Sequence, residues 1–327
     1  MYQVQFSPRG QRIATPGNET LSQVAARGEV IIPHACGKTG RCSTCRVQIL
    51  AGHSSCSPRT EKERAIAHKM RFSPDVRLAC QTVVNGDVVV KQLVQDDEDV
   101  HFSSLYIKNS PPDMFGVEKH MFILFADIRG FTAFAEKFLP YDIIYVLNRY
   151  FHAMGEVIKR HGGHIDNYMG DALLALFEAD DPREGAKRAV HAALEMLDTV
   201  KKVIQPHLNN FLGKNFSIGI GLHYGLVVAG AIGAFADKRA TVIGDAVNFA
   251  SRVETANKEA GTEFLISEET YDLVRNKIAV NRSIHVSIKG KTGKHSLFEV
   301  IGLLEEARAK KGRFWAPQYD LLPELHL

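Results

Sequence analysis

The sequence predicts an α+β protein of two domains. The chain has 327 residues, more than one ordinary hydrophobic core holds. Strand patterns alternate with amphipathic helix patterns along its whole length, which is typical of sheets covered by helices. All five cysteines lie within residues 1–80, so the front of the chain differs in chemistry from the rest.

Composition and charge favour a soluble globular protein, with 45% hydrophobic and 24% charged residues. The net charge of +3 is too small to indicate a nucleic-acid partner. Residues 1–95 carry 13 Lys and Arg against 6 Asp and Glu, a net of +7, whereas residues 96–120 carry 2 against 6, a net of −4. A basic front domain could attract an acidic partner, but an ordinary solvated surface explains it equally well.

The sequence predicts a cytoplasmic location. No apolar run is long enough to span a bilayer, and the start, MYQVQFSPRG, lacks the pattern of a secretory signal. A secreted disulfide framework normally uses an even number of cysteines, and this chain has five. We therefore expect a reducing compartment in which cysteines serve as ligands.

Residues 1–95 are expected to form a small α+β domain. YQVQF alternates as a strand does, and QRIAT follows as its hairpin partner. NETLSQVAARG predicts a helix with Asn18 or Thr20 as its cap and Gly28 as its stop. Beyond the cysteine loop, RVQIL predicts a strand, SPRTEKERAIAHKM a charged helix, and RLAC and DVVVKQLV the closing strands.

Residues 96–118 are expected to be a linker and transmission segment, because acidic DDEDV opens it and the Pro-Pro of NSPPDMFG excludes a helix. HMFILFADI then begins a second domain as a buried strand, and YDIIYVLNRYFHAMGEVIKRHGG predicts a long helix. HIDNYM and ALLALF flank Gly170 and Asp171, which predicts a hairpin with a two-residue loop.

The remaining patterns complete an α/β sandwich over residues 119–302, followed by a tail, 303–327. PREGAKRAVHAALEMLDTVKKVI predicts an amphipathic helix, and FSIGIGLHYGLVVAGAIG predicts two strands around a glycine-containing turn. GDAVNFASRVETANKEAG predicts a helix that ends at Gly261. FLISEETYDLV and SIKGKTGKHSLFEV supply the last strands.

Three cysteines share one loop, CGKTGRCSTC, at the spacing Cys36-x5-Cys42-x2-Cys45, and Cys80 lies far downstream. A disulfide inside this loop is disfavoured in a reducing compartment. Zinc usually takes two C-x2-C knuckles, and only one is present. An iron–sulfur cluster fits best, since [2Fe–2S] proteins place three thiolates in one loop and recruit a fourth from a distance.

With these residues the front domain resembles a [2Fe–2S] ferredoxin of the β-grasp kind, and the five-residue gap is similar to that of adrenodoxin-type ferredoxins. The resemblance implies that the cluster ligands are Cys36, Cys42, Cys45 and Cys80, and that a redox partner docks on this domain. Cys56 falls outside the pattern and is expected to be an ordinary thiol.

Two aspartates end apolar strands in the second domain: Asp127 in FADIRGFT and Asp171 in MGDALLALF. Such a residue is usually a helix cap or turn former. Two that converge could instead bind Mg²⁺ or Mn²⁺, which prefer carboxylates together with substrate phosphates. The pattern alone leaves both interpretations open.

FADIRGFT, GDALLALF and VIGDAVNFASR together resemble the class III nucleotidyl cyclase catalytic domain, over about residues 119–302. The resemblance implies a ferredoxin-like βαββαβ fold and conversion of a nucleoside triphosphate to a 3′,5′-cyclic monophosphate and pyrophosphate. It also implies that two catalytic domains pair head to tail and share their sites, which makes the chain a homodimer.

The resemblance assigns roles to single residues. Asp127 and Asp171, with the Ile128 carbonyl, would hold two Mg²⁺ or Mn²⁺ ions; one lowers the pKa of the ribose 3′-OH and the other neutralises the leaving phosphates. Phe131 and Thr132 begin a helix whose first amides face the phosphates.

A second group of residues would act on the ribose and phosphates. Asn248 would orient the ribose and Arg252 would stabilise charge on the α-phosphate; four residues apart, they share one helix face. Lys289 matches the phosphate-binding lysine of the family, with Lys291 as the alternative.

The purine would be read by Asn167 and Thr241. Adenylate-specific members usually have lysine at the first position, so Asn167 departs from the pattern, whereas guanylate cyclases typically have glutamate and cysteine, which are absent. Both side chains donate and accept hydrogen bonds, so they forbid neither purine. We favour ATP.

The sequence therefore predicts an adenylate cyclase regulated by a [2Fe–2S] domain, with no nucleic-acid partner and no membrane span. A guanylate cyclase is one alternative. The other is an electron-transfer or redox protein whose cyclase-like domain only binds nucleotide.

Overall fold

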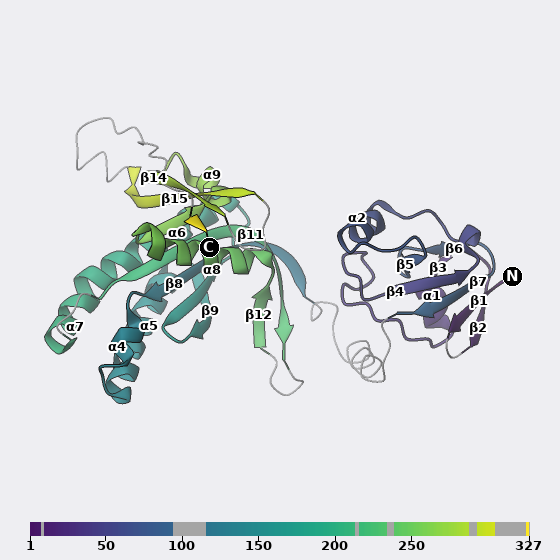
Figure 1. The fold of residues 1–327 in the computed structure, drawn as a ribbon, viewed down its shortest axis with the longest axis horizontal. Helices are drawn as coiled ribbons and strands as arrows, with labels where there is room; N and C mark the ends of the chain where they lie inside the picture. Colours follow the sequence, from purple (N-terminus) through teal and green to yellow (C-terminus); the bar gives the residue numbers. More distant parts are fainter. Residues whose placement is uncertain are drawn as a thin grey trace. The chain divides into compact units, whose positions relative to one another are not determined.

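A computed structural model describes residues 1–7, 10–93, 116–212, 216–233, 239–287, 293–304 and 325–326. The chain divides into two compact units, Met1–Val117 and Glu118–Leu327, each described below by itself (Figure 1). Most of the predicted linker and tail lie outside the described residues, so the finer domain boundaries stay predictions.

The front unit is built on a five-stranded sheet in the order β2-β1-β7-β4-β5. Its strands are β1 (Tyr2–Ser7), β2 (Gln11–Thr15), β4 (Arg46–Ala51), β5 (Val76–Leu78) and β7 (Val88–Gln92), and β3 (Glu19–Thr20) pairs with β6 (Val83–Val84) apart from them. β1 and β7 run parallel, and the other neighbours are antiparallel. Val4, Phe6 and Leu21 lie in the core that the sheet shares with α1 (Leu21–Arg27).

The predicted cap and stop of α1 are confirmed. Thr20 accepts a hydrogen bond from the backbone N–H of Gln23, whose side chain accepts one from the Thr20 N–H in return. This reciprocal pair satisfies two donors that a helix start leaves open. Gly28 ends the helix, so the local sequence alone specifies this element.

The second unit holds a large mixed sheet in the order β16-β14-β15-β13-β11-β8-β10-β9, with β12 paired to β11. The strands are β8 (Val117–Ile128), β9 (Gly163–Met169), β10 (Ala172–Phe177), β11 (Ile218–Ile232), β12 (Arg239–Ile243), β13 (Phe264–Ser267), β14 (Ile278–Ser287), β15 (Lys294–Leu303) and β16 (Leu325–His326). The helices are α4 (Phe131–Ala135), α5 (Pro140–Arg160), α6 (Pro182–Thr199), α7 (Gln205–Leu212), α8 (Asp245–Ala260) and α9 (Glu268–Val274), and a π-helical turn, Val200–Ile204, joins α6 to α7.

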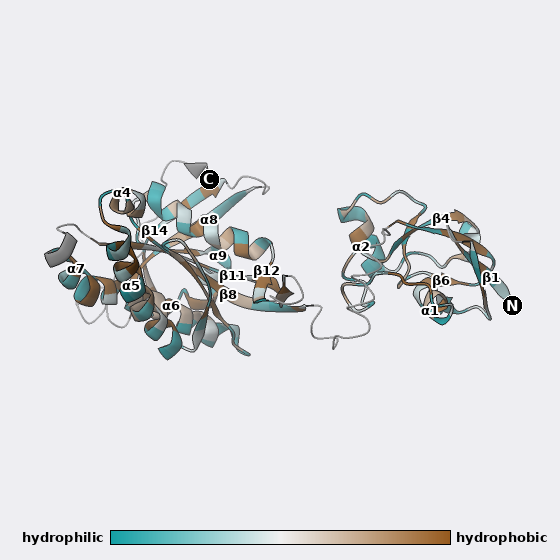
Figure 2. Ribbon diagram, turned by 90° about the horizontal axis from the view of Figure 1, so that it is seen from below, coloured by the Kyte–Doolittle hydropathy of each residue, from teal (hydrophilic) through white to brown (hydrophobic). Residues whose placement is uncertain are grey.

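Helices cover both faces of this sheet, which confirms the predicted α+β class and sandwich. Along β8, Phe122 and Leu124 face the core formed with α5 and α6, whereas Met121 and Ile123 face the one formed with α8. This split follows from the two-residue period of a strand. Figure 2 shows hydrophobic colouring along β8 and the strands beside it. None of the described helices is long and apolar enough to cross a membrane.

The prediction of two strands within FSIGIGLHYGLVVAGAIG is wrong. The segment forms one strand, β11, that passes through its glycines without a turn. A Cβ on Gly221 would lie 2.2 Å from the backbone nitrogen of Glu254, and one on Gly225 would lie 2.6 Å from the Cβ of Ala246. The glycines therefore allow α8 to cross the strand closely, which a local turn signal does not reveal.

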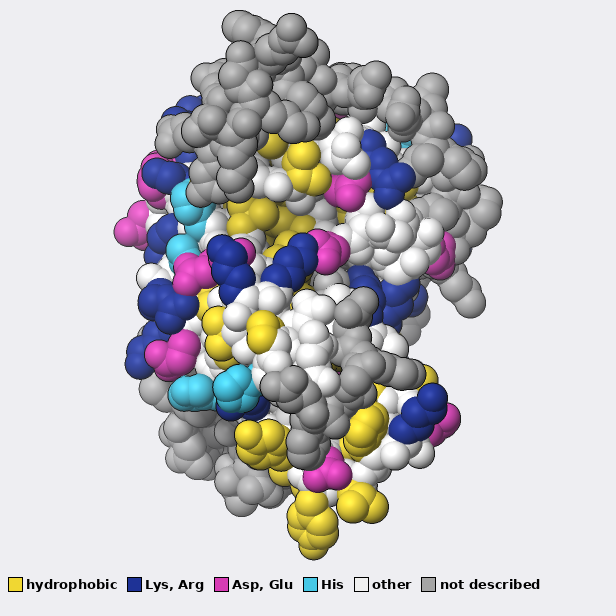
Figure 3. Space-filling model, turned by 90° about the vertical axis from the view of Figure 1, so that its left-hand side faces the viewer, with side chains coloured by type: hydrophobic (Ala, Val, Ile, Leu, Met, Phe, Trp, Pro, Cys, Tyr) yellow, Lys and Arg dark blue, Asp and Glu magenta, His cyan; other side chains and the backbone are white. Residues whose placement is uncertain are grey.

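The surface carries mixed charge on the face drawn in Figure 3. Lys and Arg side chains alternate there with Asp and Glu, and hydrophobic side chains show in a hollow between them. Among the described residues of this face, neither sign of charge forms a broad field, as the small net charge of the chain predicts.

Candidate functional sites

The four predicted cluster ligands lie in the front unit as two pairs of thiols. The Sγ atoms of Cys45 and Cys80 are 3.5 Å apart, and both residues are buried. Cys36 and Cys42 form a second pair through a side-chain hydrogen bond. No three His, Cys, Asp or Glu side chains in the described part of the chain are placed to hold one metal ion. Two pairs suit a cluster that shares four thiolates between two irons better than one zinc ion.

The backbone of the cysteine loop is shaped around these sulfurs. Gly37 and Gly40 have φ values of 63° and 73°, in the left-handed region that glycine adopts without strain. The N–H of Arg41 donates to the Sγ of Cys36 at 3.5 Å. A Cβ on Gly40 would lie 2.9 Å from the side chain of Gln81, so the loop approaches the segment after Cys80 closely. These residues fit the cluster.

Hydrogen bonds favour the thiolate form on one member of each pair. Burial alone would raise the pKa of Cys36, but hydrogen bonds from Thr39, the Arg41 N–H and Cys42 lower it to about 7. The thiol of Cys45 lowers the pKa of Cys80 to about 6, and the same contact raises the pKa of Cys45 itself. Within each pair, the contacts of one cysteine favour the thiolate, which is the form that binds iron.

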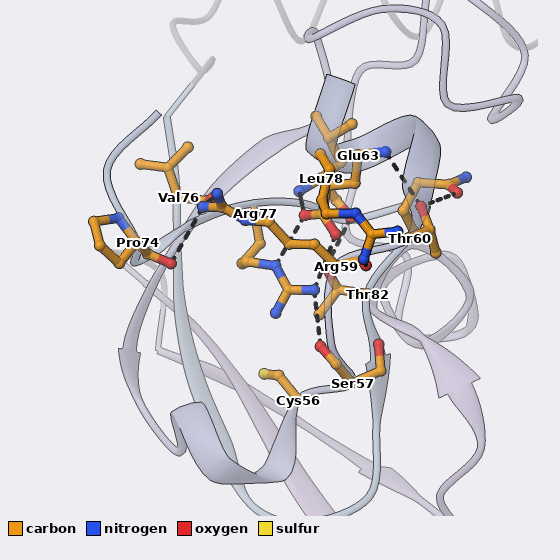
Figure 4. A network of polar contacts seen from close by, with 12 residues as sticks. Cys56, Ser57, Arg59, Thr60, Glu63, Pro74, Val76, Arg77, Leu78 and Thr82 are labelled. Carbon is orange, nitrogen blue, oxygen red and sulfur yellow. Dashed lines mark hydrogen bonds and ion pairs between the residues drawn. The ribbon is translucent and has the colours of Figure 1, made fainter. Parts of the chain in front are cut away.

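A buried ion pair that the sequence did not reveal positions the strand before Cys80 (Figure 4). Glu63, on α2 (Glu61–Lys69), is fully buried and accepts two hydrogen bonds of 2.9 Å from the guanidinium of Arg77 on β5. Its carboxylate also accepts the N–H of Leu78 at 2.7 Å. A glutamate in line with buried Ala67 on one helix face was the only signal. The pair fixes α2 to the chain two residues before the ligand.

The predicted carboxylates meet in the second unit. Asp127 lies near the end of β8, and Asp171 follows Gly170 at the tip of the β9–β10 hairpin, as predicted. Burial, and then the hydrogen bond and charge of Asp127, raise the pKa of Asp171 to about 6. Two carboxyl groups in contact favour a bound cation, and hard oxygen donors with open positions suit Mg²⁺ or Mn²⁺.

Three charged residues beside this pair were not predicted. Lys258 on α8 donates to the Oδ2 of Asp127 at 2.6 Å. Arg129 donates to Glu254 at 3.0 Å, and the missing side chain of Gly219 leaves room for its guanidinium. Burial raises the pKa of Glu254 despite Arg129. Arg129 could have been found from the sequence because it lies inside the FADIRGFT motif. No local pattern marks Lys258 or Glu254.

Tyr150, on α5, is coupled electrostatically to the two carboxylates. It is fully buried, and its hydroxyl has no hydrogen-bond partner among the described residues. Burial, and then the charges of Asp127, Asp171 and Glu254, raise its pKa. Its phenol group interrupts an otherwise apolar helix stripe, which was the available signal. A buried phenol group therefore lies within the electrostatic reach of both aspartates.

One chain does not bring all the predicted residues together. Asn248 and Arg252 are exposed on α8, whereas Lys258 of the same helix contacts Asp127, so the two sets lie on different sides of the helix. Their separation from the carboxylates fits a site that two chains complete.

The other predicted phosphate and metal residues have mixed outcomes. Ile128 is buried in the core, and Phe131 and Thr132 open α4, a helix of five residues. Lys289 and Lys291 lie outside the described residues.

Asp166, which the sequence did not single out, lies beside both candidate purine readers: it contacts Thr241 and directly precedes Asn167. The hydroxyl of Thr241 on β12 donates to the Oδ2 of Asp166 at 2.7 Å, and Arg239 donates to the Asp166 carbonyl at 3.1 Å. Asp166 directly precedes Asn167, where the pairing of β9 with β10 shifts register. These two hydrogen bonds join the segment before Asn167 to β12.

Comparisons with known proteins identify a family for each unit. Residues 117–302 match the family model of the adenylate and guanylate cyclase catalytic domain. Residues 4–85 match the 2Fe-2S iron-sulfur cluster binding domain. Both resemblances drawn from the sequence are therefore confirmed, and the front unit carries a 2Fe-2S domain.

Individual relatives differ in their nucleotide. An adenylate cyclase of Anabaena cylindrica is 40% identical over 194 residues, which cover 56% of this chain and 37% of that protein. The guanylyl cyclase Cya2 matches with a TM-score of 0.54 at 33% identity, over 58% of this chain and 95% of that structure. The adenylyl cyclase CyaB from P. aeruginosa matches with a TM-score of 0.53 at 28% identity, over 57% and 95%. The chain spans well under half the length of the curated relatives it matches first.

Proposed function

Because the chain belongs to the adenylate and guanylate cyclase family, we propose that it is an adenylate cyclase, which converts ATP to 3′,5′-cyclic AMP and pyrophosphate. The observation that carries this proposal is the contact of Asp127 with Asp171 at adjoining strand ends. Class III cyclase domains use Mg²⁺ or Mn²⁺, and this pair offers the oxygen donors for it.

The residues divide the chemistry between binding and charge stabilisation. Asp127 and Asp171, with the Ile128 carbonyl, would hold two metal ions. Bound there, the ions would make the ribose 3′-OH more acidic and neutralise the leaving phosphates. Asn248 would hold the ribose in line, and Arg252 would donate to the α-phosphate as its charge grows.

The choice of ATP is supported by the hydrogen bond between Thr241 and Asp166. A hydroxyl has one proton, and that of Thr241 is donated to the Asp166 carboxylate. Its remaining lone pairs can only accept. The amino group at position 6 of adenine is a donor, whereas the corresponding oxygen of guanine is an acceptor, so this arrangement favours adenine.

A homodimer is supported by the split site and by exposed apolar side chains near it. Tyr168 and Met169 lie exposed at the tip of the β9–β10 hairpin, and Leu226, Val228 and Ile243 lie exposed on β11 and β12. Large exposed apolar side chains on two neighbouring arms are typical of a protein interface. A second copy that covers them would bring its Asn248 and Arg252 to the carboxylates.

The front unit is proposed to regulate the cyclase through its cluster, held by Cys36, Cys42, Cys45 and Cys80. Because the proposed catalytic site is shared between chains, a small change in how they pair would alter activity. Residues 96–118 would transmit the change, and a redox partner would dock on the front unit. The odd number of cysteines favours a reducing compartment such as the cytoplasm.

The experiment below also distinguishes two alternative functions. A guanylate cyclase is favoured by the similarity to Cya2. The other alternative is an electron-transfer protein whose cyclase-like unit binds nucleotide at these carboxylates but forms no cyclic product.

The experiment is an anaerobic assay with ATP and GTP on oxidised, dithionite-reduced and Cys80→Ser protein, with visible spectra recorded. We expect cyclic AMP as the main product and a rate that depends on the state of the cluster. Equal rates in all three states would refute regulation, a preference for GTP would establish the guanylate cyclase, and no cyclic product would support the silent unit.

A further inference from the structure

A cation already contacts the first of the two aspartates. The Nζ of Lys258 lies 2.6 Å from the Oδ2 of Asp127, whose side chain is 14% exposed. Lys258 itself is 50% exposed at its side chain. The contact joins residues 131 positions apart, so the fold rather than local sequence creates it. The ammonium group therefore binds an oxygen that a divalent metal ion would also need.

Lys258 belongs to a row of alternating charges. Arg129 donates to Glu254, Glu254 lies one helical turn before Lys258, and Lys258 donates to Asp127, which contacts Asp171. Glu254 and Asp127 both act electrostatically on Lys258. The row ends in the two adjacent carboxylates of Asp127 and Asp171. Of the two cations in the row, Lys258 contacts this pair, whereas Arg129 contacts Glu254.

We propose that Lys258 is a built-in counter-cation of the metal site: its ammonium group holds Asp127 when metal is absent, and metal must displace it. The inference rests on the proposed function, because it takes Asp127 and Asp171 as metal ligands. Lys258 acts through Asp127 in this proposal and is therefore a positioning residue. It sets how much free metal the site needs before it fills.

The chemistry of lysine suits displacement. Its single ammonium group on a flexible stem makes one contact that can be released, whereas the planar guanidinium of arginine can grip a carboxylate with two parallel bonds. Because half of the Lys258 side chain already faces solvent, it can swing outward without losing much buried surface. Glu254 remains nearby to receive its charge.

The rival interpretation is an exposed ion pair of little consequence, since such pairs contribute little to stability. The two interpretations differ in what they predict for metal binding. Competition for one carboxylate makes the metal affinity depend on Lys258, and by linkage the metal weakens the Lys258 contact by the same factor. An inconsequential pair changes neither.

The test measures Mn²⁺ binding to the nucleotide-free full chain, by the electron paramagnetic resonance signal of free Mn²⁺, together with the thermal midpoint of unfolding. The variants are Lys258→Met, which keeps the stem without the charge, and Lys258→Arg. The control is Lys201→Met, because Lys201 also donates to a carboxylate at 2.6 Å, that of Glu263, and is 53% exposed.

We expect Lys258→Met to lower the Kd for Mn²⁺ roughly tenfold and Lys258→Arg to raise it. Without metal, Lys258→Met should unfold at a lower temperature than the parent, and saturating Mn²⁺ should remove that difference. Lys201→Met should leave the Kd for Mn²⁺ unchanged, and Mn²⁺ should shift its thermal midpoint by as much as it shifts that of the parent. An unchanged or higher Kd in Lys258→Met would overturn this inference alone, whereas a parent chain that binds no Mn²⁺ would overturn the proposed metal site and this inference with it.

Discussion

The two units arrange their candidate cofactor ligands in opposite ways. The front unit carries all four thiols of its cradle on one chain, two of them buried as a pair at 3.5 Å. The second unit carries its aspartates inside the fold but exposes Asn248 and Arg252 on another side of α8. In the proposed arrangement, one folded unit therefore supplies every cluster ligand, whereas the catalytic site draws residues from two chains.

The largest expected effect tests whether two chains share the catalytic site. Asp127→Ala and Arg252→Ala should each lower cyclase activity by at least about a hundredfold, since each removes a group that stabilises the transition state. Mixed together, they should recover about a quarter of the parent activity, because half of the randomly paired dimers hold one intact site of two. Activity is measured after co-refolding or co-expression, and no recovery on mixing would place the whole site in one chain.

The independence of the front unit is tested at its buried ion pair. Glu63→Gln leaves the charge of Arg77 without its partner and should destabilise the front unit by about 3–5 kcal/mol. The second unit should keep its own unfolding transition, which calorimetry resolves. Glu61→Gln, an exposed change on the same helix, is the control. A simultaneous loss of both transitions would show that the units do not fold independently.

Protons should compete with metal at the carboxylates. The pKa of Asp171 lies at about 6, above the usual value of about 3.9, so the proton-bound form persists to higher pH in the folded chain. Below about pH 6 the Kd for Mn²⁺ should rise by up to about tenfold per pH unit, and it should be flat at higher pH. Asp171→Asn should bind weakly and lose this pH dependence; a flat profile in the parent chain would contradict the assignment.

The smallest expected effect concerns the purine. Asp166→Ala frees the hydroxyl of Thr241 to donate as well as accept, so the ratio of kcat/KM for ATP over GTP should fall about tenfold. Asp198→Ala, which removes an aspartate from an exposed ion pair, is the control. A ratio that does not change would remove Asp166 from the specificity argument.

Sequence patterns identified the elements of both units wherever their signals are local. The helix cap at Thr20, one of the two caps that the pattern allowed, the loop at Gly170 and the stop at Gly261 each depend on a few adjacent residues, and each lies where predicted. Gly221 and Gly225 misled the prediction, because their requirement comes from α8 rather than from a turn.

The candidate site residues were likewise predictable only where a local motif marks them. Asp127 and Asp171 stand in recognisable motifs, and the structure brings them together. Lys258, Glu254 and Asp166 stand out by no local pattern, since their roles arise from contacts between segments far apart in the chain. The purine assignment shows the same limit, because the donor role of Thr241 depends on a partner 75 positions away.

The close passage of α8 over the glycines of β11 has a consequence for cooperativity. One side of this helix reaches the aspartates of its own chain through Lys258, and another side exposes Asn248 and Arg252. In a head-to-tail pair, the same rigid helix would serve two catalytic centres at once. Filling one centre would then shift the residues offered to the other, and metal or nucleotide titrations of the dimer should depart from a Hill coefficient of about one.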